Sequence, residues 1–595
     1  MGAPLPGRWT RPLAATALLA AVLLLAVRLA GSATLEPADF VFNNGTEIQS
    51  LDPATVTGVP EGRILRAIFE GLVTKDPATL EPVPGVAERW ERSADGKTWT
   101  FFLRPNALWS NGDRVVAQDL EWSFRRFLMP ETAAEYAYLL WCVENGREFT
   151  TGEDAEGKVV GHPEWSAVGI KALDDATLRF ELHAPLAYFL EILAFYPLYP
   201  VHRASLEDAR VRWPDTWQVE WMKPDNLVVN GPFYVETRRI NDRIRLRKNP
   251  RYWDAENVAF DTIDALAVES YGTATNLYLT GQADWLDATV PSNLVPRLMK
   301  TEDLQPKPYL GSYFYRVNVT KPPLDDARVR RALALAIPRV DICEKVTKAG
   351  QRPALSVVAW TQPRPANPLL VEDPIAEARR LLREAGYGPG LKPMPALEIH
   401  FNTSEVHKDI AEVVADVWKR ELGIDATLAN QEWKVYLDTQ NQLQYDVSRS
   451  AWIGDWCNPA PLNFLSLFVT GGENNKTGWG NPRFDQLIEV ATYTTDESER
   501  VRAMGEAEDI LMTEMPALPV YYYVSQNVVR PRLGGFHGNL LNEHFPKCWY
   551  WMDDDELAEK RTELPADIPH SAPGGPRGGK YAPVGKARQL GRAPR

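Results

Sequence analysis

Residues 397–452 decide the fold, and they read LEIHFNTSEVHKDIAEVVADVWKRELGIDATLANQEWKVYLDTQNQLQYDVSRSAW. The stretch opens on Leu397–Phe401, where apolar and polar side chains alternate as in a half-buried strand. Ser404 can then cap a helix that continues to Trp418 with its apolar residues on one face. The remaining pattern predicts, in order, a strand over Ile424–Leu428, a helix over Trp433–Thr439 and a strand over Tyr445–Trp452. This βαβαβ order is typical of an open α/β sheet.

The flanking sequence adds a second kind of pattern. Asp325–Ile337 predicts another helix, because its apolar residues share one helical face. Thr98–Arg104 and Ile240–Leu246 alternate without long helices nearby, which favours mixed or antiparallel strands. We therefore expect an α/β chain with α+β parts and at least two lobes. A ligand is expected between the lobes, beyond the carboxyl ends of the strands.

The amino-terminal residues predict a secretory signal. Arg8 and Arg11 precede the apolar run Leu13–Val27, and the small residues of 31–33 offer a cleavage site near Ala33. Retention as a membrane anchor is the alternative. Ser32 stands where a lipoprotein would carry its lipidated cysteine, so we expect an exported protein that is not a lipoprotein.

The carboxyl-terminal residues predict a disordered tail, and the cysteines do not determine a disulfide pairing. Residues 571–595 are rich in Gly, Pro and Ala and carry basic but no acidic side chains, which predicts a disordered tail. The four cysteines, Cys142, Cys343, Cys457 and Cys548, would lie in an oxidising compartment and allow three pairings, among which the sequence does not decide. Their spacing does not predict a zinc site.

Composition narrows the function. The chain of 595 residues carries a formal charge of −14, which argues against nucleic acid as a partner. Its 20 Trp, 21 Tyr and 20 Phe fit either ordinary core packing or a ligand cavity with flat walls. Motifs of serine hydrolases, P-loop nucleotide-binding proteins and zinc proteases are missing from the sequence. We expect no enzyme activity and no cofactor, with a secreted enzyme of unknown type as the alternative.

Several blocks, in order along the chain, resemble the extracytoplasmic solute-binding proteins that feed peptide ABC importers. The blocks are Asn43–Pro53, Thr98–Arg104, Trp109–Asp113, Asn230–Tyr234, Lys321–Pro323, Asp326–Arg331, Phe401–Lys408, Asn430–Lys434 and Pro519–Val524. The resemblance extends from about Phe40 to Asp553. It implies a two-lobed, hinge-closing periplasmic binding protein fold with an additional third domain.

The resemblance also implies a function and boundaries. It implies a monomeric periplasmic receptor that captures short peptides and delivers them to an ABC permease. The same scaffold binding a nickel chelate, an oligosaccharide or an opine is the alternative. The implied boundaries are a signal over 1–33, domain I over 34–69, 203–310 and 523–555, domain II over 70–202, domain III over 311–522, and a linker with a basic tail over 556–595.

Site residues follow from the resemblance one by one. Asp455 matches the residue that holds the peptide's α-ammonium, and a buried ammonium requires such a carboxylate. Arg449 and His407 match positions that meet the peptide's carboxylate at certain lengths. Gly454 would let a ligand backbone approach closely, because it has no side chain. The cavity-wall candidates are Val59, Tyr136, Trp433, Trp452 and Tyr523.

The chain departs from the family pattern at several positions. A basic residue of the family is replaced by Gln440, and a second by Thr347 with Lys348 one step away. The positions of a family disulfide are Gly311 and Ile453. These changes predict a narrower range of peptide lengths. Each candidate residue also has an ordinary alternative role in a turn, on a surface or in the core.

Overall fold

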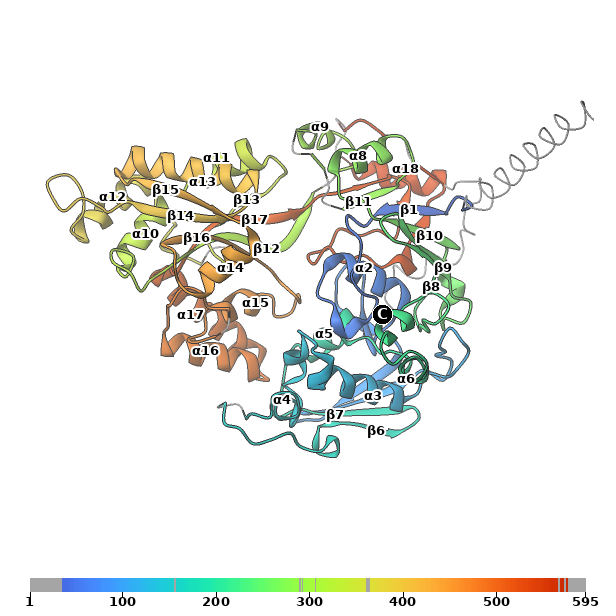
Figure 1. Ribbon diagram of the computed structural model, residues 1–595. Helices are drawn as coiled ribbons and strands as arrows, with labels where there is room; N and C mark the ends of the chain where they lie inside the picture. The colour runs from blue at the N-terminus through green and yellow to red at the C-terminus, as the bar shows by residue number, and fades with distance from the viewer. Residues whose placement is uncertain are drawn as a thin grey trace, which may run out of the picture.

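A computed structural model describes residues 35–575, except 155–156, 288–289, 292, 305, 360–363, 473, 565–567 and 572–573, and except the side chains of Trp433 and Lys434. The signal predicted over 1–33 and most of the predicted tail lie outside the described residues. The rest of the chain forms three large sheets with helices around them, arranged as two lobes (Figure 1). The predicted α/β class with α+β parts is confirmed.

One lobe, which we call the small lobe, contains the stretch that decides the fold. Its six-stranded sheet has the order β13 (Arg352–Pro353), β17 (Ala517–Ser525), β12 (Lys307–Val317), β16 (Val447–Ile453), β14 (Leu397–Asn402) and β15 (Ala426–Gln431). Strand β14 pairs in parallel with both β15 and β16. The connecting helices are α13 (Glu405–Val417) and α14 (Trp433–Asn441). The predicted βαβαβ order is therefore confirmed.

Helices of the small lobe cover this sheet with their apolar faces. In α13, Ile410 and Val414 are fully buried, as the pattern predicts, although Ser404 makes no side-chain capping bond there. The predicted helix near residue 330 is α10 (Ala327–Leu335), capped by Asp326. The other helices are α11 (Arg339–Asp341), α12 (Pro374–Glu384), α15 (Leu462–Leu465), α16 (Pro482–Tyr493) and α17 (Glu497–Glu514).

The other lobe, which we call the large lobe, contains two sheets. The first has the order β18 (Asn527–Val529), β11 (Trp285–Asp287), β1 (Phe40–Asn43), β10 (Thr262–Leu266), β9 (Arg243–Lys248) and β8 (Phe233–Arg239). Its helices are α2 (Val59–Ile68), α8 (Tyr271–Leu279), α9 (Val295–Leu298) and α18 (Asp554–Thr562). The strand predicted from Ile240 begins three residues later, because Asn241 adopts a left-handed turn conformation with φ 58°.

The second sheet of the large lobe is antiparallel throughout. Its order is β4 (Ala87–Arg92), β5 (Thr98–Leu103), β7 (Thr177–Glu181) and β6 (Ile170–Asp174). Helices α3 (Ala117–Leu128), α4 (Gly146–Thr151), α5 (Phe189–Leu193), α6 (Arg203–Arg212) and α7 (Trp217–Trp221) accompany it, with the short hairpin β2 (Val73–Lys75) and β3 (Pro82–Pro84). The predicted strand near residue 100 is confirmed.

The two largest buried cores support the division into lobes. The two sheets of the large lobe share one core, which contains Phe40, Phe101 and Trp285. Tyr313 and Val414 lie in the second core, which belongs chiefly to the small lobe. Strands β12 and β17 run from one lobe to the other (Figure 1). These two strands are therefore the structural candidates for a hinge. The domain boundaries themselves stay a prediction.

The segment after residue 553 is more ordered than the sequence predicts. Residues 554–562 form helix α18, where a linker was expected, and Arg561 pairs with Glu302 at 2.6 Å. Ser571 also donates its backbone N–H to Glu302 at 2.7 Å. All four cysteines are free thiols. Within the described ranges, no helix is both long enough and apolar enough to cross a membrane.

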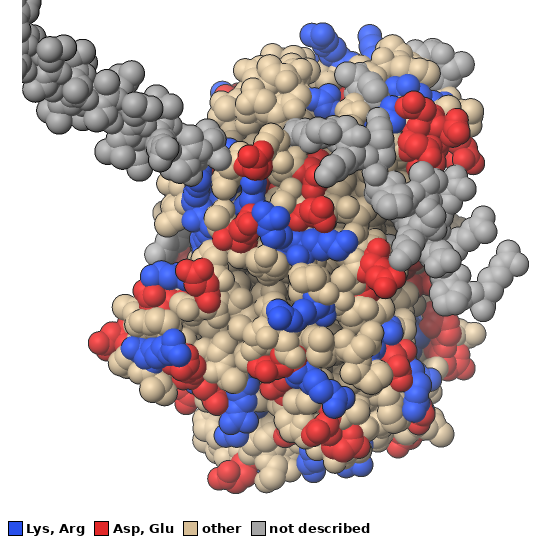
Figure 2. All heavy atoms as spheres, turned by 90° about the vertical axis from the view of Figure 1, so that its right-hand side faces the viewer, with Lys and Arg blue, Asp and Glu red and all other residues tan. Residues whose placement is uncertain are grey.

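Surface charge agrees with the argument from composition. On the face of the large lobe that Figure 2 shows, acidic and basic side chains are interspersed among uncharged ones. A phosphate backbone is bound by a continuous basic surface, which this described face does not present.

Candidate functional site

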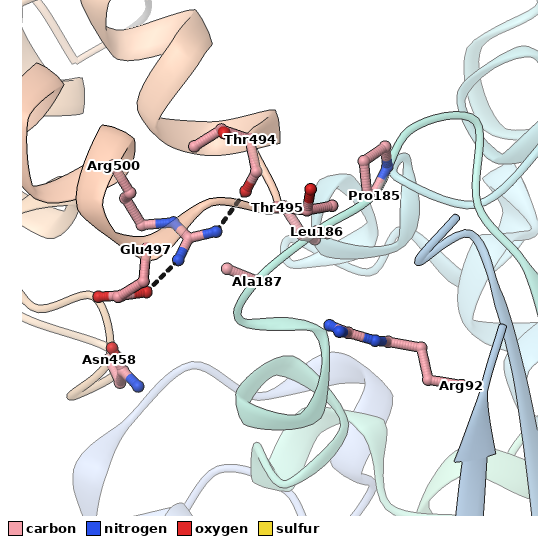
Figure 3. A pocket seen from close by; sticks show the side chains of 9 residues that line it. All are labelled: Arg92, Pro185, Leu186, Ala187, Asn458, Thr494, Thr495, Glu497 and Arg500. Atoms are coloured by element: carbon pink, nitrogen blue, oxygen red, sulfur yellow. Dashed lines mark hydrogen bonds and ion pairs between the residues drawn. The ribbon is translucent and has the colours of Figure 1, made fainter. Parts of the chain in front are cut away.

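The two lobes touch along one side of their junction. Trp456 of the small lobe stacks on Tyr188 of the large lobe, with ring centroids 4.8 Å apart and an interplanar angle of 8°. His183 meets Tyr493 edge to face across the same junction at 5.9 Å. Figure 3 shows a neighbouring part of the junction, where Pro185 and Arg92 come from the large lobe and Arg500 comes from the small lobe. The segment after β16 therefore lies at the contact between the lobes.

Asp455 is the second residue after β16, at this contact. The backbone of Gly454 donates to the Leu310 carbonyl at 2.7 Å, and that of Asp455 donates to Asn463 Oδ1 at 2.8 Å. Burial raises the pKa of Asp455 to about 6, while Lys75 acts to lower the pKa and Glu543 to raise it. The turn is thus fixed by the small lobe, while the carboxyl group experiences charges of the large lobe.

Those charges form a buried cluster around Lys75. Its Nζ lies 3.3 Å from Glu543 Oε2 and 3.8 Å from Glu191 Oε2. Arg66 pairs with Glu543 at 2.7 Å. Burial raises the pKa of Glu191 to about 7, which indicates that its charge is incompletely compensated.

Counting charges shows what this cluster lacks. Asp455, Glu191 and Glu543 supply three negative charges when all are ionised, whereas Lys75 and Arg66 supply two positive ones. A buried carboxylate without a countercharge is unfavourable. The cluster is therefore suited to accept one further cation.

A second cluster surrounds Arg449 on β16. Arg449 donates to Asn402 Oδ1 and to the Tyr523 hydroxyl, both at 3.3 Å, and its guanidinium lies 4.9 Å from the ring centroid of Tyr313. Its Nε is buried without a hydrogen-bond partner, and no described carboxylate lies within ion-pair distance. A cation held by neutral groups is suited to bind an anion.

His407 belongs to the same cluster but adds no fixed charge. Its Nδ1 lies 3.4 Å from the hydroxyl of Tyr313. Burial, together with the charge of Arg449, lowers the pKa of His407 to about 3. The imidazole is therefore neutral at neutral pH, and Arg449 alone supplies the positive charge among these residues.

The predicted wall residues lie in different surroundings. Tyr136 packs edge to face on Phe195 at 5.1 Å, and burial together with the charge of Asp455 raises its pKa to about 12. The indole Nε1 of Trp452 is buried without a partner among the described residues. Val59 begins α2 with 52% of its surface exposed. The side chain of Trp433 lies outside the described set.

Packing within the small lobe gives Gly454 a second reason to be a glycine. A Cβ at this position would lie 2.6 Å from Leu310 Cδ2 and 3.2 Å from Asn463 Cγ. The protein's own side chains occupy this space, so packing by itself requires a glycine here. The site role of Gly454 itself stays a prediction.

The positions that depart from the family pattern have clear local roles. Gln440 is buried and donates to the Arg449 carbonyl at 3.0 Å, so it supports the strand that carries Arg449. Gly311 and Ile453 are register partners on β12 and β16, and a Cβ on Gly311 would lie 2.5 Å from Ile453 Cδ1. Lys348 lines a different pocket, with Pro296 and Gln351.

The sequence analysis did not identify the large-lobe residues of the buried cluster around Lys75. Lys75 ends the buried run Leu72–Lys75, and Glu191 stands inside the apolar helix α5. A charged residue within an apolar run is a signal for a buried ion pair or a site, and it could have identified both. Their proximity to Asp455 could not be read from the sequence.

Comparisons with known proteins agree with the described geometry. The family model described as bacterial extracellular solute-binding proteins, family 5 Middle, matches residues 81–476. The chain is 36% identical to the periplasmic oligopeptide-binding protein OppA of Salmonella typhimurium, over 89% of this chain and 95% of that one. It is 34% identical to the periplasmic murein peptide-binding protein MppA of Escherichia coli, over 85% of this chain and 91% of that one.

Solved structures show the same similarity. The unliganded open form of the murein tripeptide-binding protein MppA superposes with a TM-score of 0.73 at 33% identity, covering 88% of this chain and 99% of that one. Haemophilus influenzae OppA in complex with the peptide RPPGFSPFR superposes with a TM-score of 0.69 at 32% identity, covering 87% of this chain and 100% of that one. Both are two-lobed periplasmic peptide-binding proteins, so the predicted two-lobed architecture is confirmed.

Proposed function

Because this chain belongs to the family 5 bacterial extracellular solute-binding proteins, we propose that it is a receptor that captures short peptides between its lobes and passes them to an ABC import permease. The observation that carries the proposal is a pair of uncompensated charges of opposite sign, one at Arg449 on β16 and one at Asp455 just after it. A zwitterionic ligand such as a peptide satisfies both.

The open edge of β16 supports an extended peptide as the ligand. On one side, β16 pairs with β12 along its whole length. On the other side, its register with β14 includes only Val447 and Ser448. The backbone of residues 449–453 thus has no strand partner on that side among the described strands. An extended peptide could pair there by strand addition.

The spacing of the two charges bears on peptide length. Asp455 lies six positions after Arg449, which in extended chain is a distance of at most about 20 Å. The long arginine side chain can shorten this span on the ligand side. Peptides of a few residues therefore fit between an ammonium at Asp455 and a carboxylate at Arg449.

We expect a narrow length preference. Gln440 and Thr347 remove two positive charges that the family pattern places in the site, so the carboxylate of a longer peptide would be buried without a cation. Calorimetric titration with alanine peptides of two to eight residues should show the tightest binding at short lengths, with a loss of at least about tenfold beyond them. Equal affinities across the series would contradict this expectation.

A different solute on the same scaffold is the alternative. Escherichia coli YgiS, described as a probable deoxycholate-binding periplasmic protein, is 32% identical over 87% of this chain and 94% of that one. A nickel chelate, an oligosaccharide or an opine are further possibilities. The excess negative charge around Asp455 favours a ligand with a cationic group, which a neutral sugar or a bile acid lacks.

The proposal includes a non-enzymatic role. The family and the similar proteins bind solutes, which supports capture without chemical conversion. Native mass spectrometry of the purified protein should detect retained peptides, and a peptide mixture incubated with the protein should be recovered uncleaved. Cleavage products would favour the enzyme alternative.

We also propose a periplasmic location, with export through the amino-terminal signal. The similar OppA and MppA proteins are periplasmic. Amino-terminal sequencing of the exported protein should begin within a few residues of Thr34. A chain that starts at Met1 in the membrane fraction would instead support the anchor alternative.

Peptide binding should weaken in acid. A bound ammonium requires ionised Asp455, whose pKa burial raises to about 6 in the free protein. Affinity should therefore be highest near pH 7 and fall about tenfold for each pH unit below about 6. Above about pH 8 it should fall again, because the peptide's own α-amino group, whose pKa is about 8, loses its proton. Titration calorimetry between pH 8 and pH 5 measures this dependence.

Two variants make the pH experiment specific. Glu191 lies beside the same Lys75, and burial raises its pKa to about 7, so it titrates in the same range. Glu191→Gln should keep the acid weakening if Asp455 carries it, whereas Asp455→Asn should bind weakly at every pH. A loss of the pH dependence in Glu191→Gln would assign it to Glu191 instead.

A further inference from the structure

A second cavity lies at the junction of the lobes, next to the pocket of Figure 3. Its volume is about 510 Å³, within the range of small-molecule sites, roughly 300–1,000 Å³. The large lobe contributes residues 138–148 and parts of 183–192, and the small lobe contributes Trp456 and Tyr493. Leu186 lines both this cavity and the one in Figure 3. We call it the junction cavity.

The walls of the junction cavity are aromatic. Tyr138, Trp141 and Tyr188 come from the large lobe, and Trp456 and Tyr493 from the small lobe. The rings of Tyr188 and Trp456 are stacked on each other across the junction, so they form one continuous aromatic wall. Flat apolar walls of this kind select a planar ring.

Arg147 brings a cation without an ion-pair partner among the described residues to the lining of the junction cavity. The indole N–H groups of Trp141 and Trp456 and the Nε of Arg147 are all buried without a hydrogen-bond partner in the described chain. The guanidinium of Arg147 lies 5.2 Å from the ring centroid of Trp141, and none of the described carboxylates forms an ion pair with it. These three buried nitrogen atoms are closed off from the cavity, so the cation available to a ligand's carboxylate is the rest of the Arg147 guanidinium, which lines the cavity.

The cavity also carries carboxylates. Glu144 and Glu148 line it, and neither forms an ion pair within the described residues. Cys142 lines it as well, and burial raises the pKa of this thiol to about 12, so it is a neutral group rather than a nucleophile. The junction cavity thus combines a cation and two carboxylates, all without ion-pair partners among the described residues, with walls made of aromatic rings.

We propose that the junction cavity is a second binding site, which takes a free aromatic amino acid. Its ring lies among the aromatic side chains, its carboxylate pairs with the guanidinium of Arg147, and its ammonium is balanced by Glu144 or Glu148. The site is distinct from the proposed peptide site, because Asp455 and Arg449 do not line it.

The site can be tested independently of peptide binding. Calorimetry should show that Asp455→Asn, in which the proposed peptide site is impaired, still takes up one L-tryptophan per chain. L-leucine, which lacks the ring, and tryptamine, which lacks the carboxylate, should bind at least about tenfold more weakly. Binding to this variant cannot be attributed to the ammonium site, so a failure here leaves the proposed function untouched.

Two arginine substitutions test which arginine binds the carboxylate of the ligand. Arg147→Met should lower the affinity for L-tryptophan about ten- to hundredfold, because a charge-assisted hydrogen bond to the carboxylate is lost. Arg92→Met, which alters an arginine of the neighbouring cavity in Figure 3, should leave it unchanged. No saturable uptake by Asp455→Asn, or equal uptake by Arg147→Met, would overturn the proposal. Displacement of L-tryptophan from the parent protein by a saturating peptide would also overturn it.

Discussion

Replacing Asp455 by Asn should lower the affinity for short peptides about 30- to several-thousand-fold. The substitution keeps the size of the side chain but removes the negative charge that an incoming ammonium needs. Removing one partner of a buried charge pair typically costs ~2–5 kcal/mol, which corresponds to this range of affinities. Titration calorimetry with a tripeptide measures the change.

A double comparison isolates the proposed pair. Acetylating the peptide's amino end removes the cation while keeping the backbone, so it should weaken binding to the parent protein strongly. The same acetylation should weaken binding to Asp455→Asn much less, because the partner charge is already gone. Glu191→Gln is the matched control, since it neutralises a carboxylate of the same cluster that is not expected to touch the ammonium. Equal binding of free and acetylated peptides by the parent protein would favour a different solute.

The same variant should not destabilise the free protein. The pKa of Asp455 is raised in the fold, so protonation favours the folded state, and stability is lost as pH rises from about 4 through about 6. At neutral pH the ionised carboxyl group therefore costs stability. Asp455→Asn should raise the free energy of unfolding at pH 7 by about 1–3 kcal/mol. Thermal or denaturant unfolding without peptide checks the sign, and a clear loss of stability would contradict the argument.

The local order of the small lobe could be predicted, because it depends on short-range periodicity. The alternation at Leu397–Phe401 and the apolar face of α13 both repeat within a few residues, and both elements form where they were expected. The observed start of a strand differs from the predicted start where a turn competes with the strand, as at Asn241 before β9. Helix α18 is not predicted by periodicity, because its charged sequence shows no apolar face. The sequence signal for it is the capping box formed by Asp553 and Glu556.

The cluster around Arg449 could be predicted from the sequence better than the cluster around Lys75 and Asp455. Arg449 and His407 were expected together from the resemblance, and the structure places both beside Tyr313. The partners of Asp455 were not foreseen, because Lys75 and Glu543 are far away in sequence and approach it only through the arrangement of the lobes. Gly454 shows the converse case, in which a glycine next to a site residue is explained by packing on Leu310.

Arg449 should be the residue on which recognition of the peptide's carboxylate depends. Because His407 is neutral at neutral pH, Arg449→Met removes the only fixed positive charge of this cluster among the described residues. We expect the affinity for the preferred short peptide to fall about 30- to several-thousand-fold, since its carboxylate would be buried without a cation. His407→Ala should cost less than about tenfold, because it removes at most a neutral hydrogen bond.

A chemical change in the peptide provides the control for this variant. Amidating the peptide's carboxyl end should weaken binding to the parent protein strongly, but should change binding to Arg449→Met little, because each change removes one partner of the same pair. Folding should tolerate the substitution, since Arg449 forms no ion pair with the described residues and Met retains much of its apolar stem. If His407→Ala costs as much as Arg449→Met, the imidazole must be protonated in the complex. The positive charge that holds the carboxylate would then be shared between the two side chains, and affinity would fall as pH rises through the pKa of His407 in the complex.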